Sequence, residues 1–174
     1  MKVLFTTIIL LFITSAYSQD STKRLTKFEE FGNENGVLMK SQTIDMGKVK
    51  GFIMSKWVST NIETGETLKA VQVSERVRFL GYAIGSTILI DEEEIPAVIK
   101  TLKYFLSNVT NDPCKENCPS YTYRTYGGVS ISCTKFIGAY GSNWHIYIGR
   151  WGVPMIDLDP KEFENFLKLL ESYK

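Results

Sequence analysis

The sequence has little of the chemistry that most enzymes need. It holds one histidine, His145, and no serine-hydrolase elbow, zinc-protease helix, phosphate-binding loop or dinucleotide-binding turn. A general base needs a nucleophile and an orienting acid, and no local motif supplies them to His145. A hydrolase centred on His145 would require an acid and a hydroxyl group within hydrogen-bond reach. We therefore predict no enzyme activity and no cofactor, and we interpret His145 as a strand residue on the solvent side.

An excess of charge of one sign is also missing. The chain has 20 Lys and Arg residues against 19 Asp and Glu residues, and no like-charge run stands out. A nucleic-acid-binding protein usually carries a strongly basic face, so nucleic acid is not the expected partner. Three cysteines and one distant histidine show no metal-ligand spacing, so we predict no metal site.

No apolar run is long enough to span a membrane. The run Val3–Ile13 follows Lys2 and precedes small polar residues, whereas a spanning helix needs about 20 apolar residues. This layout is typical of a secretory signal peptide. Ala16 and Ser18 suit the −3 and −1 positions, so we predict a signal peptide at 1–18 and cleavage before Gln19. The expected product is secreted or periplasmic, soluble and unanchored.

Cysteines are few and odd in number. An oxidising compartment would leave at least one of Cys114, Cys118 and Cys133 unpaired. A Cys114–Cys118 bridge would clip the loop NDPCKENCPSY, and a Cys118–Cys133 bridge is the second possibility. Cys133 shares a strand face with Val129 and Ile131, so we interpret it as a buried, inert thiol.

What is present is a succession of strand-like segments. Residues 19–35 are polar and predict a lead-in outside the folded domain. Four segments rich in β-formers follow, at 36–46, 49–60, 67–81 and 86–90. Turns are predicted at 47–48 and 61–66.

A helix with a one-sided apolar stripe is predicted over 95–106. Asp91 and Glu94 have the spacing of a capping box, yet Pro96 would then fall in the second helical turn. Either the first turn is distorted or the helix begins near Ile95.

A second set of strands and a helix follow the loop at 109–119. The strand-like segments lie at 121–128, 129–138, 143–152 and 153–158. Asp159, Pro160 and Glu162 then supply an N-cap, a first-turn proline and an acid at N3, a strong helix start. Aromatic and aliphatic residues form the apolar stripe of this helix over 163–173.

The two strand–helix units align without a gap at an offset of 68 residues. Asp91 then matches Asp159, Glu94 matches Glu162, and Gly81 matches Gly149. We predict an α+β fold of two ββββα repeats, residues 36–108 and 120–174, packed with pseudo-twofold symmetry as a single domain over 36–174.

This order of elements resembles the Whirly and Pur-type folds, which bind single-stranded nucleic acids. The resemblance covers roughly residues 36–174 and concerns element order. It implies the duplicated fold, and single-stranded nucleic-acid binding is the alternative function. That function would require one contiguous basic groove. The residues expected to line it are Lys48, Lys50, Lys56, Arg76 and Arg78.

Aromatic residues and arginines gather late in the chain and suggest a binding surface. Such side chains stack on sugars, bases or the side chains of a partner. The alternative is that they form cross-strand pairs that stabilise a sheet. The candidate ligand-binding residues are Tyr121, Tyr123, Arg124, His145, Tyr147, Arg150 and Trp151. The sequence thus favours an exported, non-catalytic binding domain for an unknown protein or envelope ligand.

Overall fold

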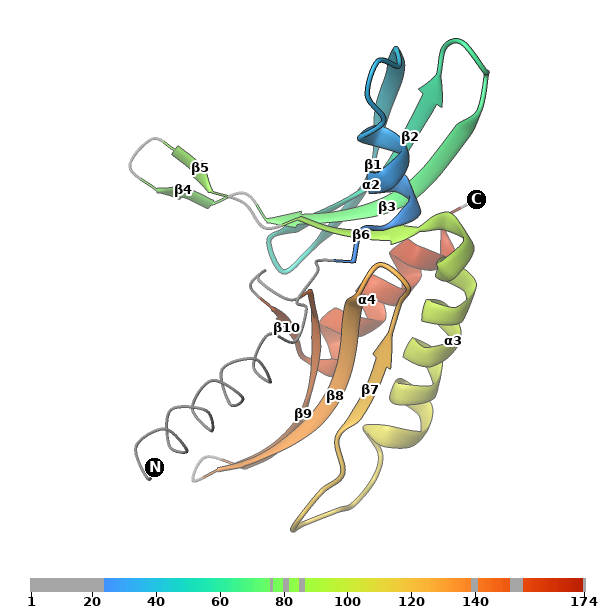
Figure 1. Ribbon diagram of the computed structural model, residues 1–174. Coiled ribbons are helices and arrows are strands. Elements are labelled where there is room, and N and C mark those ends of the chain that lie inside the picture. Colours follow the sequence, from blue (N-terminus) through green and yellow to red (C-terminus); the bar gives the residue numbers. More distant parts are fainter. Residues whose placement is uncertain are drawn as a thin grey trace, which may run out of the picture.

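The computed structural model describes residues 24–75, 77–79, 82–84, 87–138, 141–150 and 155–173. The predicted signal peptide and its cleavage site lie outside these residues. The described part holds two four-stranded antiparallel sheets, each followed by a helix (Figure 1). Within this part, no helix is long and apolar enough to cross a membrane.

Both sheets are antiparallel meanders, in which each strand pairs with the next strand of the same sheet. The first sheet contains β1 (Met39–Val49), β2 (Phe52–Asn61), β3 (Thr67–Glu75) and β6 (Thr87–Asp91), followed by the 3₁₀ turn η1 (Glu92–Glu94), α3 (Ile95–Tyr104) and the π-helical turn η2 (Phe105–Val109). The second contains β7 (Tyr121–Arg124), β8 (Val129–Gly138), β9 (Gly141–Arg150) and β10 (Ile156–Leu158), followed by α4 (Pro160–Glu171). The predicted α+β fold with two ββββα units is confirmed.

One continuous core joins the two units. The inner faces of both sheets and the apolar stripes of both helices contribute to it, including Val71 and Ile90 from the first sheet and Ile146 from the second. Leu102 of α3 and Leu170 of α4 are fully buried, and each such side chain stabilises the fold by about 1.5–3 kcal/mol. Neither unit could hide its apolar face without the other.

The first unit carries an inserted hairpin. Ile88 of β6 pairs with Val73, and Ile156 of β10 pairs with Ile148. The residue numbers of Ile88 and Ile156 differ by 68, whereas those of their partners, Val73 and Ile148, differ by 75. The seven extra residues correspond to β4 (Val77–Phe79) and β5 (Tyr82–Ile84), a separate two-stranded sheet.

This insertion corrects the gapless alignment. The match at offset 68 holds for the last strand and the helix of each unit. It fails upstream, because Phe79 lies in β4 whereas Tyr147 lies in the long strand β9. Gly81, the proposed counterpart of Gly149, lies outside the described residues.

The two long helices start differently. Asp159 caps α4 with the predicted capping box, in which its side chain accepts the N–H of Glu162. The capping box expected at Asp91 is wrong: its carboxylate accepts the N–H groups of Lys27 and Phe28 instead. α3 begins at Ile95, which leaves Pro96 in the first turn, where its missing N–H costs nothing.

The polar lead-in is also corrected. Residues 27–32 form the short helix α2 (Lys27–Gly32), capped by Thr26 in a capping box with Glu29. Phe28 packs against Ala70 and Leu89 on the outer face of the first sheet. Six residues are too few to show a helical period, which is why the composition alone looked unstructured.

The first chain reversal lies three residues later than predicted. β1 passes through Gly47, whose positive φ belongs to a bulge between Asp45 and Gly47. The turn is formed by Lys50 and Gly51, both with positive φ, as a two-residue hairpin turn requires. A glycine within a strand pattern marked a bulge here, not a turn.

The cysteines behave as first interpreted. Cys114 and Cys118 form a disulfide with Cα atoms 5.6 Å apart, and Cys133 is a buried free thiol. The alternative Cys118–Cys133 bridge is therefore wrong. Burial raises the pKa of the Cys133 thiol to about 12, so the reactive thiolate is scarce at neutral pH.

Candidate functional site

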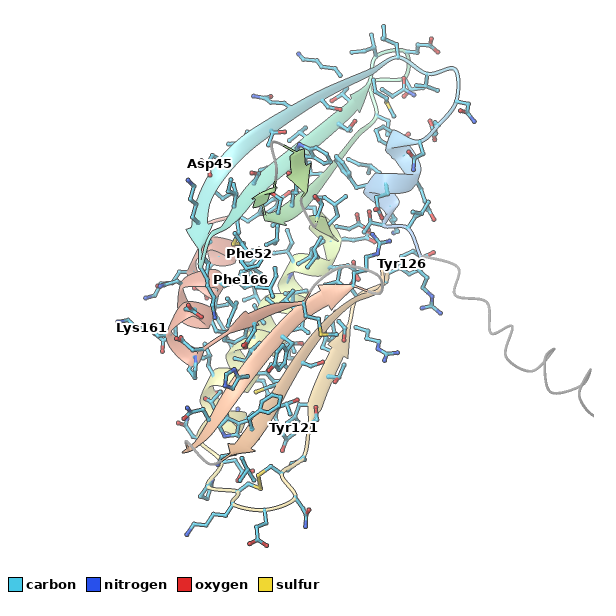
Figure 2. The ribbon with its side chains drawn as sticks, turned by 90° about the vertical axis from the view of Figure 1, so that its left-hand side faces the viewer. Asp45, Phe52, Tyr121, Tyr126, Lys161 and Phe166 are labelled. Carbon is cyan, nitrogen blue, oxygen red and sulfur yellow. A yellow bond between two sulfur atoms is a disulfide. The ribbon has the colours of Figure 1, made fainter. Side chains whose placement is uncertain are left out.

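Among the described residues, no helix covers one face of the second sheet, because α3 and α4 pack on the other face. In Figure 2 the strands of this sheet lie in front of both helices. We call this surface the open face. Strand alternation defines it: Ile146 and Ile148 point into the core, so His145 and Tyr147 point outward. Its side chains are Thr122, Arg124, Ser130, Ser132, Thr134, Phe136, Asn143, His145, Tyr147 and Asp157.

Three rings gather on the open face. Phe136 meets the imidazole of His145 edge-on at 5.5 Å between ring centroids, and meets Tyr147 edge-on at 6.1 Å. The rings of His145 and Tyr147 are nearly parallel at 6.2 Å. Phe136 remains 53% exposed, so the cluster presents an apolar ring to any molecule that covers it.

A carboxylate completes the cluster from the neighbouring strand. Asp157 is the register partner of Tyr147, and its Oδ1 lies 2.9 Å from Nδ1 of His145. This contact fixes the orientation of the imidazole. Burial, and then the carboxylate of Asp157, raise the pKa of Tyr147, while Lys50 opposes the shift.

Lys50 links the open face to α4. Its ammonium group donates to the carbonyl oxygen of Asp157 at 2.8 Å and lies 3.1 Å from the carboxylate of Glu162. The hydrogen bond to Glu162 is the main cause of the raised pKa of Lys50. The strand that carries Asp157 is thereby tied to the first hairpin.

Hydroxyl groups occupy the rest of the open face. Thr122 and Ser132 are joined by a hydrogen bond of 3.0 Å, and Ser120 and Thr134 by one of 2.8 Å. Thr134 is the register partner of His145. Rings and a carboxylate on one side and hydroxyl groups on the other give a mixed surface, suited to both apolar and hydrogen-bonding contacts.

The structure brings together only some of the predicted binding residues. His145, Tyr147 and Arg124 lie on the open face. Tyr121 and Tyr123 do not, because their register partners Cys133 and Ile131 point into the core.

Both tyrosines pack on the core side. Tyr121 lies 6.5 Å from Phe105 between ring centroids. Burial raises the pKa of Tyr123, with Glu94 as the second cause. Neither ring is available to a ligand on the open face.

Of the last two predicted residues, one lies away from the open face and the other is not described. The side chain of Arg150 is 4% exposed and forms an ion pair with Glu29. Trp151 lies outside the described residues.

Sequence reasoning missed Phe136 and Asp157. The alternation that assigned Val129, Ile131 and Cys133 to the core also assigns Phe136 to the opposite face. Asp157 lies between Ile156 and Leu158, both buried, and must face outward for the same reason. Strand alternation therefore indicated both residues, but it had been used only to assign core positions in these strands.

The open face supplies part of a hydrolytic constellation. Asp157 is an acid in contact with His145. However, among the hydrogen bonds of the described residues, none joins the imidazole to a hydroxyl group. The described residues also contain no group of three or more potential metal-ligating acids, cysteines and histidines.

The lysines expected to line a nucleic-acid groove are separated. Lys48 and Lys56 pair with Ile53 and Ile44 across β1 and β2, and their side chains lie on opposite faces of the first sheet. Lys50 is paired with Glu162. Arg76 and the side chain of Arg78 lie outside the described residues.

No protein-family model matches this chain, and no curated protein is similar to it in sequence. The functional proposal therefore rests on the geometry of the open face.

Proposed function

We propose that this protein is an exported, non-catalytic binding domain, and that its open face contacts a partner protein or a ligand of the cell envelope. The observation that carries the proposal is the cluster of Phe136, His145 and Tyr147, joined by Asp157, on a sheet face that no helix of the described residues covers. Rings and charge-assisted hydrogen bonds in one patch are typical of energetically important interface residues.

Export is supported by the chain's chemistry. The first 18 residues have the layout of a signal peptide. The disulfide between Cys114 and Cys118 suits an oxidising compartment, because such bonds are rare in the reducing cytosol.

Binding without catalysis is supported by the setting of His145. Asp157 orients its ring through Nδ1, as the acid of a hydrolytic triad does, but among the hydrogen bonds of the described residues none joins the imidazole to a hydroxyl group that could act as the nucleophile. A ring held in this way provides a flat contact surface and a polar edge, as interface aromatics do.

The test is capture from the envelope of the exporting cell, including its polysaccharide fraction, with immobilised protein. Phe136→Ser and Tyr147→Ser remove one exposed and one half-buried ring of the open face without altering the core. Each should lower the amount of captured ligand about tenfold. Tyr104→Ser is the matched control, since Tyr104 is 51% exposed but lies on α3. Equal capture by all four proteins, with unchanged circular dichroism, would disprove the proposal.

A further inference from the structure

Strand β9 is only partly covered on one side. β8 pairs with all ten residues of β9, from Gly141 to Arg150, whereas β10 pairs only with Ile146, Tyr147 and Ile148. The chain then leaves the sheet, because Asp159 caps α4. Among the described residues, no strand pairs with positions 141–145 on the β10 side.

An uncovered strand edge is a hydrogen-bonding surface. In an antiparallel sheet, every second residue directs both its N–H and its C=O toward the same neighbour. Within the described part of the chain, alternate positions of 141–145 therefore present main-chain groups without a strand partner to the space where β10 would have continued. Such edges accept an added strand.

A hollow of about 580 Å³ borders this edge. It is formed by Thr110 at the end of η2, by β8 and β9 of the second sheet, and by the start of α4. The residues that line it are Thr110, Lys135, Asn143, Trp144, His145, Asp159, Pro160 and Lys161. An extended peptide advances about 3.3 Å per residue, so a segment of about five residues would match positions 141–145.

The hollow favours an acidic side chain. The ammonium group of Lys135 donates to the carbonyl oxygens of Asp112 and Cys114, which are neutral groups. Lys161 is exposed on the first turn of α4 and has no ion-pair partner among the described residues. Figure 2 shows its side chain pointing away from the core, unlike that of Phe166.

Among the described residues that line the hollow, the one carboxylate is already engaged. Asp159 accepts the N–H of Glu162 as the cap of α4. It therefore offsets the charge of the two lysines only in part, and the net charge that a ligand meets is positive.

We propose that an extended segment of a partner protein, carrying at least one acidic side chain, adds to the edge of β9 at positions 141–145, antiparallel to β9. The segment continues the line of β10 and places its acidic side chain near Lys161. His145 lies both in the open face and beside this edge, so one partner can occupy both. This inference deepens the proposed function and rests on it, because it states which element of a partner is held.

The probe is a phage-displayed library of random 12-residue peptides, selected on the exported chain. We expect enriched peptides with an acidic residue among alternating polar and apolar ones. Bound peptide should slow amide hydrogen exchange at alternate positions within 141–145, measured by NMR. Lys161→Glu should weaken binding at least about fivefold, and Lys168→Glu, an exposed residue in the last turn of the same helix, should not.

Three outcomes would overturn the inference: no enriched peptide, peptides that protect amides elsewhere, or equal affinity for Lys161→Glu and wild type. The proposed function is judged separately. If Phe136→Ser and Tyr147→Ser lose envelope capture while no peptide protects the edge, the inference alone fails. If both variants retain capture, the proposed function fails.

Discussion

The guanidinium group of Arg150 in β9 donates to both carboxylate oxygens of Glu29 in α2, each at 2.8 Å. A second nitrogen of Arg150 donates to the carbonyl oxygen of Arg24. The two side chains are 4% and 18% exposed. This buried pair attaches the short N-terminal helix to the second sheet, whereas Asp91 attaches it to the first.

Replacing Arg150 by methionine should destabilise the protein by about 3 kcal/mol, because the carboxylate of Glu29 loses its buried counter-charge. Urea denaturation followed by circular dichroism measures the difference. The exposed pair of Lys27 and Glu93 is the control, and Glu93→Gln should change the stability far less, because solvent screens an exposed pair. Equal costs for the two variants would show that the Arg150 pair is not a structural anchor.

Gly127 should not tolerate a side chain. A Cβ at this position would meet the Cγ2 atom of Thr26 well inside contact distance and its Cα at 3.3 Å. Gly127→Ala should therefore cost about 1–3 kcal/mol by overpacking. Thr26→Ser removes Cγ2 but keeps the capping hydroxyl, so it should recover part of that loss in the double variant. If the changes in unfolding free energy of the two single variants simply add up in the double variant, as measured by urea denaturation, the contact between the two residues is contradicted.

Glu94 should make stability depend on pH in mildly acidic solution. Burial raises the pKa of its carboxyl group above the usual 4.5, against the opposing N–H of Tyr126. Folding then favours the protonated form, so this term stabilises the protein below about pH 4.5 and is lost as pH rises through the higher, folded value.

Glu94→Gln removes this titration and retains an oxygen that can accept from Tyr126. The variant should gain stability relative to wild type between pH 4 and pH 7, as measured by urea denaturation at each pH. The pH 4 comparison is the internal control. A difference that stays constant across this range would exclude Glu94 as the cause.

Of the three cysteines, Cys133 should be a free thiol, and Cys114 and Cys118 should be joined in a disulfide. Cys133 is buried and its pKa is raised to about 12, so the native protein should release almost no colour from Ellman's reagent. Unfolding in guanidinium without reductant should expose one thiol per chain. Three thiols under those conditions would show that Cys114 and Cys118 are not bonded.

The elements with a long, regular pattern could be predicted from the sequence. The apolar residues of α3 and of α4 recur on one side of each helix, and these sides form part of the core. The start of α4 could also be predicted, because the N-cap Asp159, the first-turn Pro160 and the N3 acid Glu162 lie within a single turn.

The face of a short strand could not be predicted. Tyr121 and Tyr123 alternate with Thr122 and Arg124, and four residues without an aliphatic side chain do not reveal which face is buried. The pairing of Tyr121 with Cys133 shows which face is buried. This register depends on tertiary structure and cannot be deduced from the local sequence. For Arg150, alternation with Ile148 did indicate an inward side chain.

Partners far apart in sequence were likewise beyond local rules. Asp91 was expected to cap the helix that follows it, the nearest use for a carboxylate. It bonds instead to N–H groups 63 and 64 residues earlier in the chain. The β4–β5 hairpin was not predicted either. Residues 67–81 form one β-rich segment in the sequence, and nothing local shows that the strand ends before β4 begins.

A consequence for the order of folding follows from the placement of α2. Six residues form no stable helix in isolation. The groups that hold this one come from β6 and from β9, the latter 121 residues downstream. In a chain synthesised from its N-terminus, α2 is therefore made early but can settle only after β6 and β9 have been completed.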